Sequence, residues 1–234
     1  MDAAEGVSAA GMRVLLADVL VKIMRCLANL ALAPRLRAQV ARHADINCII
    51  DVLGGAFFMY IVYKCICASH TVAASDSRRS TVEEELVLNA VAATHNLVYA
   101  AQSDNCLWVS RLQLLPLLVN RLFDSSAAIV AEAASAVANL SVADDVRVAL
   151  VRNRALQACV MLLDHSDVAV CCAVCGLIMN VSANPECAAH LIDAGAHFKL
   201  VEAAVAHVDS DISGNGVISS NACRALTNVR DSLR

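Results

Sequence analysis

The stretch ASAVANLSVADDVRVALV, from Ala134 to Val151, is apolar almost throughout but carries an asparagine, Asn139, near its start. An amide among apolar side chains needs hydrogen-bond partners when it is buried. The same setting recurs along the chain in CLANLA (Asn29), ATHNLV (Asn96), AVANLS (Asn139), LIMNVS (Asn180) and ALTNVR (Asn228). This recurrence indicates an internal repeat.

The spacing of these asparagines predicts a repeat of about 42 residues. The last three intervals are 43, 41 and 48 residues. The first is 67 residues, and its excess is explained by the apolar run Ile49–Ala68 and the polar loop 69–80 that follows it. A period of about 40–47 residues is typical of repeats built from two or three helices.

Each period contains segments for three helices. In one period these are Asp144–Asn153, Ala155–His165 and a longer segment that runs from Asp167 to Asn180. The next period repeats them as 184–195, 196–208 and, after a loop at 209–217, a helix through Asn228. Asp167 is predicted to cap the third helix, and Ser80–Glu83 is typical of a capping box.

Composition predicts an all-α fold. Hydrophobic residues make up 59% of the chain and aromatic residues 3%, with only 8 glycines and 3 prolines, so helix breakers are scarce. We expect a single helical solenoid over residues 12–234, preceded by an unstructured segment 1–11. Its third helices are expected to end near residues 30, 97, 140, 181 and 229.

Several classes of function are disfavoured. The net charge is −4 and the lysines are few, so the chain offers no basic surface for nucleic acid. It carries no phosphate-binding loop, dinucleotide fingerprint or zinc-protease motif, so we expect neither an enzyme nor a cofactor. The run DHSD (Asp164–Asp167) has the letters of a hydrolase triad, but four adjacent residues in a turn cannot surround a substrate carbonyl.

The cysteines and the apolar run Ile49–Ala68 bear on the compartment. Most of the 11 cysteines lie inside apolar helical runs and no secretory signal is evident, which favours a reducing, cytoplasmic location. The apolar run is nearly long enough to span a bilayer. Because it contains Asp51, Lys64 and the pair Gly54–Gly55, a buried core helix is favoured over a membrane span.

The asparagine segments, together with AGAHFKLV (Ala194–Val201), resemble the armadillo-repeat family from about Arg13 to Val229. The resemblance implies a right-handed α-solenoid of about four armadillo-type three-helix repeats. Within the family, EEELVLNAVAATHNL (Glu83–Leu97) and VCCAVCGLIMNVS (Val170–Ser182) are most similar to an armadillo protein of ciliated and flagellated cells.

The resemblance also implies that the third helices line a concave groove, into which their asparagines project. There each amide would donate to and accept from the backbone of an extended partner chain. Alternatively, each asparagine bonds the last carbonyls of its own helix or the neighbouring repeat. The sequence leaves both interpretations open.

Other groove positions follow from helical spacing. One turn before the asparagines lie Arg25, Ala92, Ser135, Gly176 and Arg224, and two turns before them lie Lys22, Asn89, Glu132, Ala173 and Asn221. In importin-type relatives tryptophans at the first of these turns hold a basic nuclear-localisation signal, whereas none of these residues is aromatic and Trp108 falls in a first helix. Such a mixed surface suits an acidic or neutral protein segment, the alternative being a solvated face.

We therefore expect a non-catalytic protein-binding adaptor, with no membrane and no nucleic-acid partner. If the narrower resemblance extends to function, its role lies in assembly or transport of cilium or flagellum components. The predicted partner-binding residues are Arg25, Asn29, Asn89, Asn96, Glu132, Ser135, Asn139, Asn180, Asn221, Arg224 and Asn228. The alternative is a metal- or redox-responsive protein that uses the Cys171–His190 cluster, where Cys172, Cys175, Cys187 and His190 have a spacing like that of zinc ligands.

Overall fold

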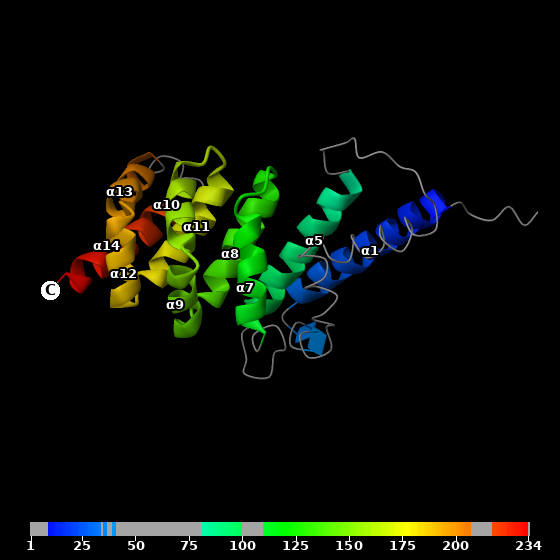
Figure 1. Ribbon diagram of the computed structural model, residues 1–234, viewed down its shortest axis with the longest axis horizontal. Helices are drawn as coiled ribbons and strands as arrows, with labels where there is room; N and C mark the ends of the chain where they lie inside the picture. The colour runs from blue at the N-terminus through cyan, green and yellow to red at the C-terminus, as the bar shows by residue number, and fades with distance from the viewer. Residues whose placement is uncertain are drawn as a thin grey trace, which may run out of the picture.

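The computed structural model describes residues 9–33, 35–36, 39–40, 81–99, 110–206 and 217–233. Within these ranges the chain is helical and contains no strand, as composition predicted. The helices succeed one another along the long axis of the molecule, from the N-terminal to the C-terminal end (Figure 1). The chain therefore forms an extended stack in which each repeat contacts mainly the repeats next to it.

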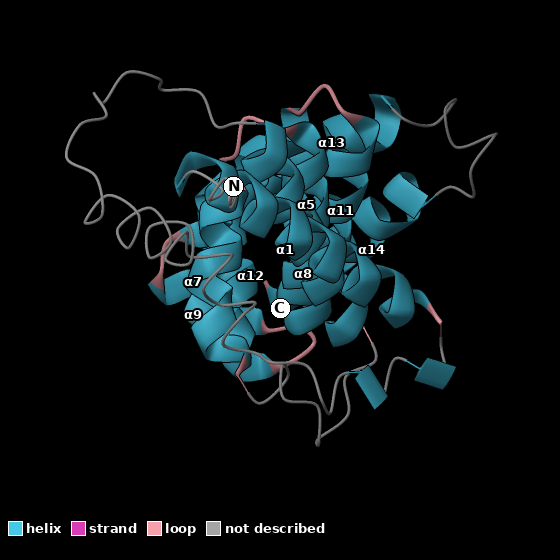
Figure 2. Cartoon of the chain, turned by 90° about the vertical axis from the view of Figure 1, so that its right-hand side faces the viewer, coloured by secondary structure: helices cyan, strands magenta, loops and turns pink. Residues whose placement is uncertain are grey.

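The third helices of the repeats form one continuous layer. They are α1 (Ala9–Leu32), α5 (Thr81–Val98), α8 (Ala127–Leu140), α11 (Val168–Val181) and α14 (Val217–Ser232). Each one packs on the next, from α1 on α5 through to α11 on α14. In the view along the stack, α1, α5, α8 and α11 overlap near the centre (Figure 2).

The remaining helices complete the repeats. They are α7 (Arg111–Arg121), α9 (Asp144–Arg152), α10 (Ala155–Met161), α12 (Pro185–Asp193) and α13 (Ala196–Ala206). A short 3-10 turn, Leu162–Asp164, extends α10. Helices α9, α10 and α11 make one full three-helix unit and α12, α13 and α14 the next, in agreement with the helices expected from the sequence.

Small side chains let the third helices approach closely. On α8 the residues Ala133, Ala134, Ala136, Val137 and Leu140 are fully buried. The buried residues of the described helices, from Leu20 to Ala225, join into one core cluster. Because each unit contributes only part of this core, its apolar faces are covered only when neighbouring units stack on it.

The helix starts follow capping rules. The Asp167 carboxylate accepts from the backbone N–H groups of Ala169 at 2.8 Å and Val170 at 3.3 Å, which confirms its predicted role at the start of α11. The Asn184 side chain likewise accepts from the N–H of Cys187 at 3.1 Å at the start of α12. The predicted capping box at Ser80–Glu83 lies outside the residues whose side chains are described.

The turns between first and second helices use the left-handed backbone region. Gly195, between α12 and α13, has φ +77°, which glycine adopts without steric cost. Arg154, in the same place between α9 and α10, has φ +54°. A side chain at that φ is disfavoured, so this turn carries strain that its counterpart avoids.

One predicted boundary differs from the structure, and several segments named in the sequence analysis lie outside the described residues. Helix α1 begins at Ala9, so residues 9–11 of the segment 1–11 are helical rather than unstructured, because they continue the first turns of α1. The apolar run 49–68, the loop 69–80, Trp108 and nearly all of the loop 209–217 lie outside the described residues. Among the helices described, none is both long and apolar enough to cross a membrane.

Candidate functional site

The predicted partner-binding residues lie on the third helices, which the structure places in one layer. We name the surface that they form the asparagine face, and define it by Arg25, Asn29, Asn89, Asn96, Glu132, Ser135, Asn139, Asn180, Asn221, Arg224 and Asn228. Asn29, Arg25 and Arg224 are exposed, and the other eight are partly buried. Along the stack these residues run from α1 at one end to α14 at the other (Figure 1).

Four of the five recurrent asparagines connect adjacent third helices. Each donates from Nδ2 to a backbone carbonyl of the preceding third helix: Asn96 to Ala28 at 3.2 Å, Asn139 to His95 at 3.3 Å, Asn180 to Ala138 at 2.8 Å and Asn228 to Met179 at 3.3 Å. In every case the acceptor residue immediately precedes the asparagine of the previous repeat. The Nδ2 groups of these four asparagines therefore bond the neighbouring repeat, which was one of the two interpretations that the sequence left open.

Two serines that the sequence did not predict as site residues, Ser141 and Ser182, belong to the same network. Ser141 is buried, and its hydroxyl donates at 2.7 Å to the Ala138 carbonyl that Asn180 also reaches. The Ser182 hydroxyl donates to the Met179 carbonyl at 2.9 Å and accepts from Asn228 Nδ2 at 3.1 Å. The signal was present in the repeated Asn-x-Ser triplets of ANLS and MNVS.

The amide oxygens are left for other partners. Among the described residues, Oδ1 of Asn139 and Oδ1 of Asn180 have no hydrogen-bond donor. Both side chains are partly exposed. An amide oxygen has two lone pairs, so the face presents acceptors whose positions are set by the bonds between repeats.

At the N-terminal end of the face, the charged side chains are paired within the protein. Lys22 donates to Asp18 at 2.6 Å along α1. Arg25 forms an ion pair with Glu85, which joins α1 to α5. Asn89 donates at 2.9 Å to the carbonyl of Glu85, one turn earlier in its own helix.

The centre of the face carries a carboxylate–imidazole contact. Glu132 Oε2 lies 2.7 Å from Nδ1 of His95, which links α8 to α5. Both side chains are partly exposed, at 28% for His95 and 36% for Glu132. Arg25 and Glu132 on this face thus each have a partner within the protein, whereas none of the described carboxylates pairs with Arg224.

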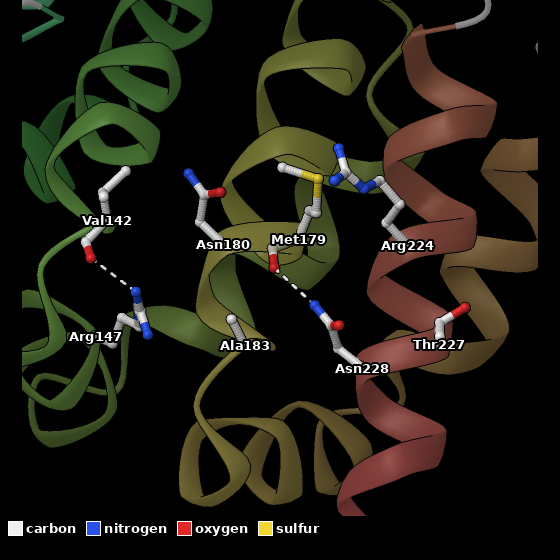
Figure 3. Close-up of a pocket in the computed structure, with 8 residues that line it drawn as sticks. All are labelled: Val142, Arg147, Met179, Asn180, Ala183, Arg224, Thr227 and Asn228. Carbon is white, nitrogen blue, oxygen red and sulfur yellow. Dashed lines mark hydrogen bonds between the residues drawn. The ribbon is translucent and has the colours of Figure 1, made fainter.

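At the C-terminal end, α11 and α14 border a cavity of about 380 Å³. Three predicted residues, Asn180, Arg224 and Asn228, line it together with Val142, Arg147, Met179, Ala183 and Thr227 (Figure 3). Asn221 lies one turn before Arg224 in α14, where its Nδ2 is 3.5 Å from the position that a Cβ on Gly176 would occupy. A methyl group at Gly176 would make an ordinary van der Waals contact there, so α11 and α14 lie within side-chain contact at this point.

Arg147 is a third residue of the site that the sequence did not predict. It lies on α9, and its guanidinium donates at 2.7 Å to the carbonyls of both Ser141 and Val142. These carbonyls follow the end of α8, where a positive charge is favourable. Nothing in the sequence pairs a first-helix arginine with a preceding helix end, so only the structure places it at the cavity.

The metal or redox alternative is not supported by the geometry. Among the residues that the structure describes, no three or more cysteine, histidine or acidic side chains gather as metal ligands. Cys175 and Cys187 are buried while His190 is exposed, because the two pairs belong to different faces of different helices. The Cys171–His190 cluster therefore does not form a site.

Burial also makes the core thiols poor nucleophiles. Desolvation raises the pKa of Cys159 to about 12. A hydrogen bond to Cys171, together with burial, raises the pKa of Cys175, and desolvation raises that of Cys187. A thiol reacts through its thiolate, so these groups are unreactive near neutral pH.

Three residues of the Asp164–Asp167 run have structural roles. Asp164 accepts from Lys199 Nζ at 2.5 Å, which joins successive second helices. His165 Nδ1 accepts from the N–H of Asp167 at 3.0 Å, and Asp167 caps α11. Asp164, His165 and Asp167 are thus engaged in an ion pair, a turn and a helix cap.

Comparisons by sequence lead to one named protein. No family model matches the chain. The chain is 25% identical over 216 residues to armadillo repeat-containing protein 2 of Bos taurus, which covers 92% of this chain and 22% of that protein. The human protein of the same name is 28% identical over 185 residues, covering 79% and 19%. The chain thus spans about a fifth of the length of these relatives.

Comparisons by structure lead to designed armadillo repeat proteins. One, described as computationally designed for modular peptide recognition, matches with a TM-score of 0.66 and 22% identity, covering 90% of this chain and 76% of that chain. Another, solved in complex with the peptide (KR)4, matches with a TM-score of 0.64 and 21% identity, covering 90% and 78%. The chain is an armadillo-type right-handed α-solenoid, and its sequence is similar to that of armadillo repeat-containing protein 2.

Proposed function

We propose that this protein is a non-catalytic scaffold that binds an extended segment of another protein along the asparagine face. The observation that carries this proposal is the ladder of four asparagines, whose donors hold the repeats together while the oxygens of Asn139 and Asn180 have no donor among the described residues. Such oxygens match the backbone N–H groups of an extended chain, which are present whatever its sequence.

Rigidity of the face supports binding. Each asparagine of the ladder is held by a carbonyl of the preceding helix, so its orientation is set before a partner arrives. Pre-organised groups lose less conformational entropy on association. Two designed armadillo repeat proteins, one described as made for peptide recognition and one solved in complex with a peptide, have a similar fold, which supports assigning the ligand class.

The proposed cellular role is assembly or transport of cilium or flagellum components from the cytoplasm. It is supported by the resemblance of segments 83–97 and 170–182 to an armadillo protein of ciliated and flagellated cells, and by the similarity of 92% of the chain to armadillo repeat-containing protein 2. On this proposal the chain contributes the binding surface and another protein supplies the extended segment.

A steric block at the middle of the face tests the proposal. Ser135, on α8, is partly exposed and lies one turn before Asn139. Ser135→Trp places a large ring across the face, whereas Met161→Trp adds the same ring on α10, where the side chain is 74% exposed. Ser135→Arg is a second, more flexible block in case the indole perturbs folding.

Proximity labelling in ciliated cells gives the measurement, with circular dichroism to verify that each variant keeps the wild-type helicity and melting temperature. We expect a set of neighbouring proteins to be lost from both Ser135 variants and retained by Met161→Trp. Purified segments of those proteins should then bind the wild type and not the Ser135 variants. Equal labelling by all variants would show that partners use another surface.

A further inference from the structure

The charge on the asparagine face is uneven. Arg25 on the face and Lys22 beside it form ion pairs with Glu85 and Asp18, and Glu132 is hydrogen-bonded to His95. A charged ligand that passes these positions meets side chains that already have a partner within the protein. The exception lies at the C-terminal end of the face.

Arg224 carries that uncompensated charge. Among the residues described by the structure, no carboxylate lies within ion-pair distance of its guanidinium, and the side chain is exposed. Figure 3 shows it extending from α14 toward Met179, along the edge of the 380 Å³ cavity. By contrast Arg230, two turns further along the same helix, is paired with Asp231 at 2.8 Å.

Arg147 adds positive charge on the other side of the cavity. Its guanidinium is oriented by the carbonyls of Ser141 and Val142, and its Nη1 forms an ion pair with the carboxylate of Asp144 at 3.6 Å. A guanidinium has five N–H donors, and these two bonds use only some of them. Figure 3 shows Arg147 and Arg224 on opposite sides of Asn180 and Met179.

The rest of the lining is mixed in polarity. Val142 and Met179 offer apolar surface, while Thr227 and the Asn180 amide add polar groups. A side chain with a short hydrocarbon stem and an anionic end is complementary to this combination, because carboxylates form charge-assisted bonds with guanidinium groups. A lysine or arginine in the same place would be repelled by the guanidinium of Arg224, which has no carboxylate partner among the described residues.

From this geometry we infer that the cavity between α11 and α14 takes an acidic side chain of the bound protein segment, with Arg224 as the residue that selects it. The inference rests on the proposed function, because it assumes a segment that lies along the asparagine face. It deepens that function by assigning one chemical preference to one position, which the uncharged amide ladder does not provide.

The net charge of the protein favours basic ligands, so a preference for acidic peptides can be distinguished from long-range attraction. The formal net charge is −4, so long-range attraction favours basic ligands. The designed armadillo protein with a similar fold was solved with the basic peptide (KR)4. A preference of this chain for acidic peptides would therefore come from the local cavity.

The experiment measures fluorescence anisotropy of three labelled octapeptides, (SE)4, (SQ)4 and (SK)4, with the wild type, Arg224→Gln and Arg230→Gln. Both substitutions remove one positive charge from α14, so they match in net charge. We expect (SE)4 to bind most tightly to the wild type. Arg224→Gln should raise the Kd for (SE)4 about 5-fold, the size of one partly exposed ion pair, and Arg230→Gln should leave it within about 2-fold.

The peptides separate this inference from the proposed function. If (SQ)4 binds as tightly as (SE)4 and Arg224→Gln has no effect, the acidic preference is wrong while binding along the face stands. If Arg230→Gln weakens (SE)4 as much as Arg224→Gln does, the preference is a general charge effect and the cavity assignment is wrong. If none of the three peptides binds, both proposals fail.

Discussion

The asparagine ladder predicts a specific loss of stability when one of its bonds is removed. Asn180→Leu keeps the approximate shape of the side chain but removes the Nδ2 donor that lies 2.8 Å from the Ala138 carbonyl. The matched control is Asn29→Leu, because Asn29 is exposed and donates to no described carbonyl. The two variants make the same chemical change at equivalent positions of two repeats.

The expected loss of stability depends on which hydrogen bonds the Ala138 carbonyl keeps after the substitution. A neutral hydrogen bond contributes about 0.5–1.5 kcal/mol, and an orphaned buried acceptor costs about 1–3 kcal/mol more. After the substitution the carbonyl still accepts from the Ser141 hydroxyl at 2.7 Å, so the second cost does not apply. We therefore expect Asn180→Leu to lower the free energy of unfolding by about 1 kcal/mol, and Asn29→Leu to change it by less than about 0.5 kcal/mol.

Urea unfolding followed by circular dichroism measures this difference. With a denaturant dependence of about 2 kcal/mol per molar urea, 1 kcal/mol lowers the midpoint by about 0.5 M. The double variant with Ser141→Ala should lose more than the two single variants together, because the Ala138 carbonyl would then have neither donor. Equal midpoints for Asn180→Leu and Asn29→Leu would refute the role of the ladder in joining repeats.

Three further predictions follow from other contacts. Asp167→Ala should lower the free energy of unfolding by about 1 kcal/mol in urea titrations, because α11 loses its cap. Arg154→Gly should leave the melting temperature unchanged or raise it, since φ +54° suits glycine, whereas Arg152→Gly within α9 should lower it; a lower melting temperature for both would contradict strain at this turn. The pKa of Cys159 is raised from 9.0 to about 12, so as pH rises the thiol ionises first in the unfolded chain. The free energy of unfolding should therefore fall between these pH values by about 1.4 kcal/mol per pH unit. Urea unfolding at pH 8 and at pH 10.5 should show a smaller loss of stability with pH for Cys159→Ala than for the wild type.

Local features of the fold were predictable from the sequence because local interactions determine them. The periodic apolar residues predicted α9, α10 and α11, and Asp167 predicted the start of α11. Cap preferences and helical periodicity act over a few residues, so they can be read without knowing how helices pack. The recurrence of asparagine about every 42 residues also identified which helices are equivalent.

The chemistry of the candidate surface depended on packing. The sequence left open whether an asparagine bonds a partner chain or its neighbouring repeat, because both roles need the same residue at the same helical position. The structure decides the donor: Asn180 Nδ2 reaches Ala138, 42 residues away. It likewise brings Arg147 to the end of α8 and leaves Arg224 without a described carboxylate, since distances between residues of different repeats depend on how the helices stack.

By itself the sequence determined the helical class, the repeat length and the helices that carry the asparagines, because each of these depends on the order of residues along one helix or on its recurrence. Only the tertiary structure decided which side-chain donors form hydrogen bonds between repeats, which charged groups form ion pairs and where a cavity lies between α11 and α14. Those properties belong to pairs of groups on different helices, and only the packing of the helices brings the two groups of each pair together.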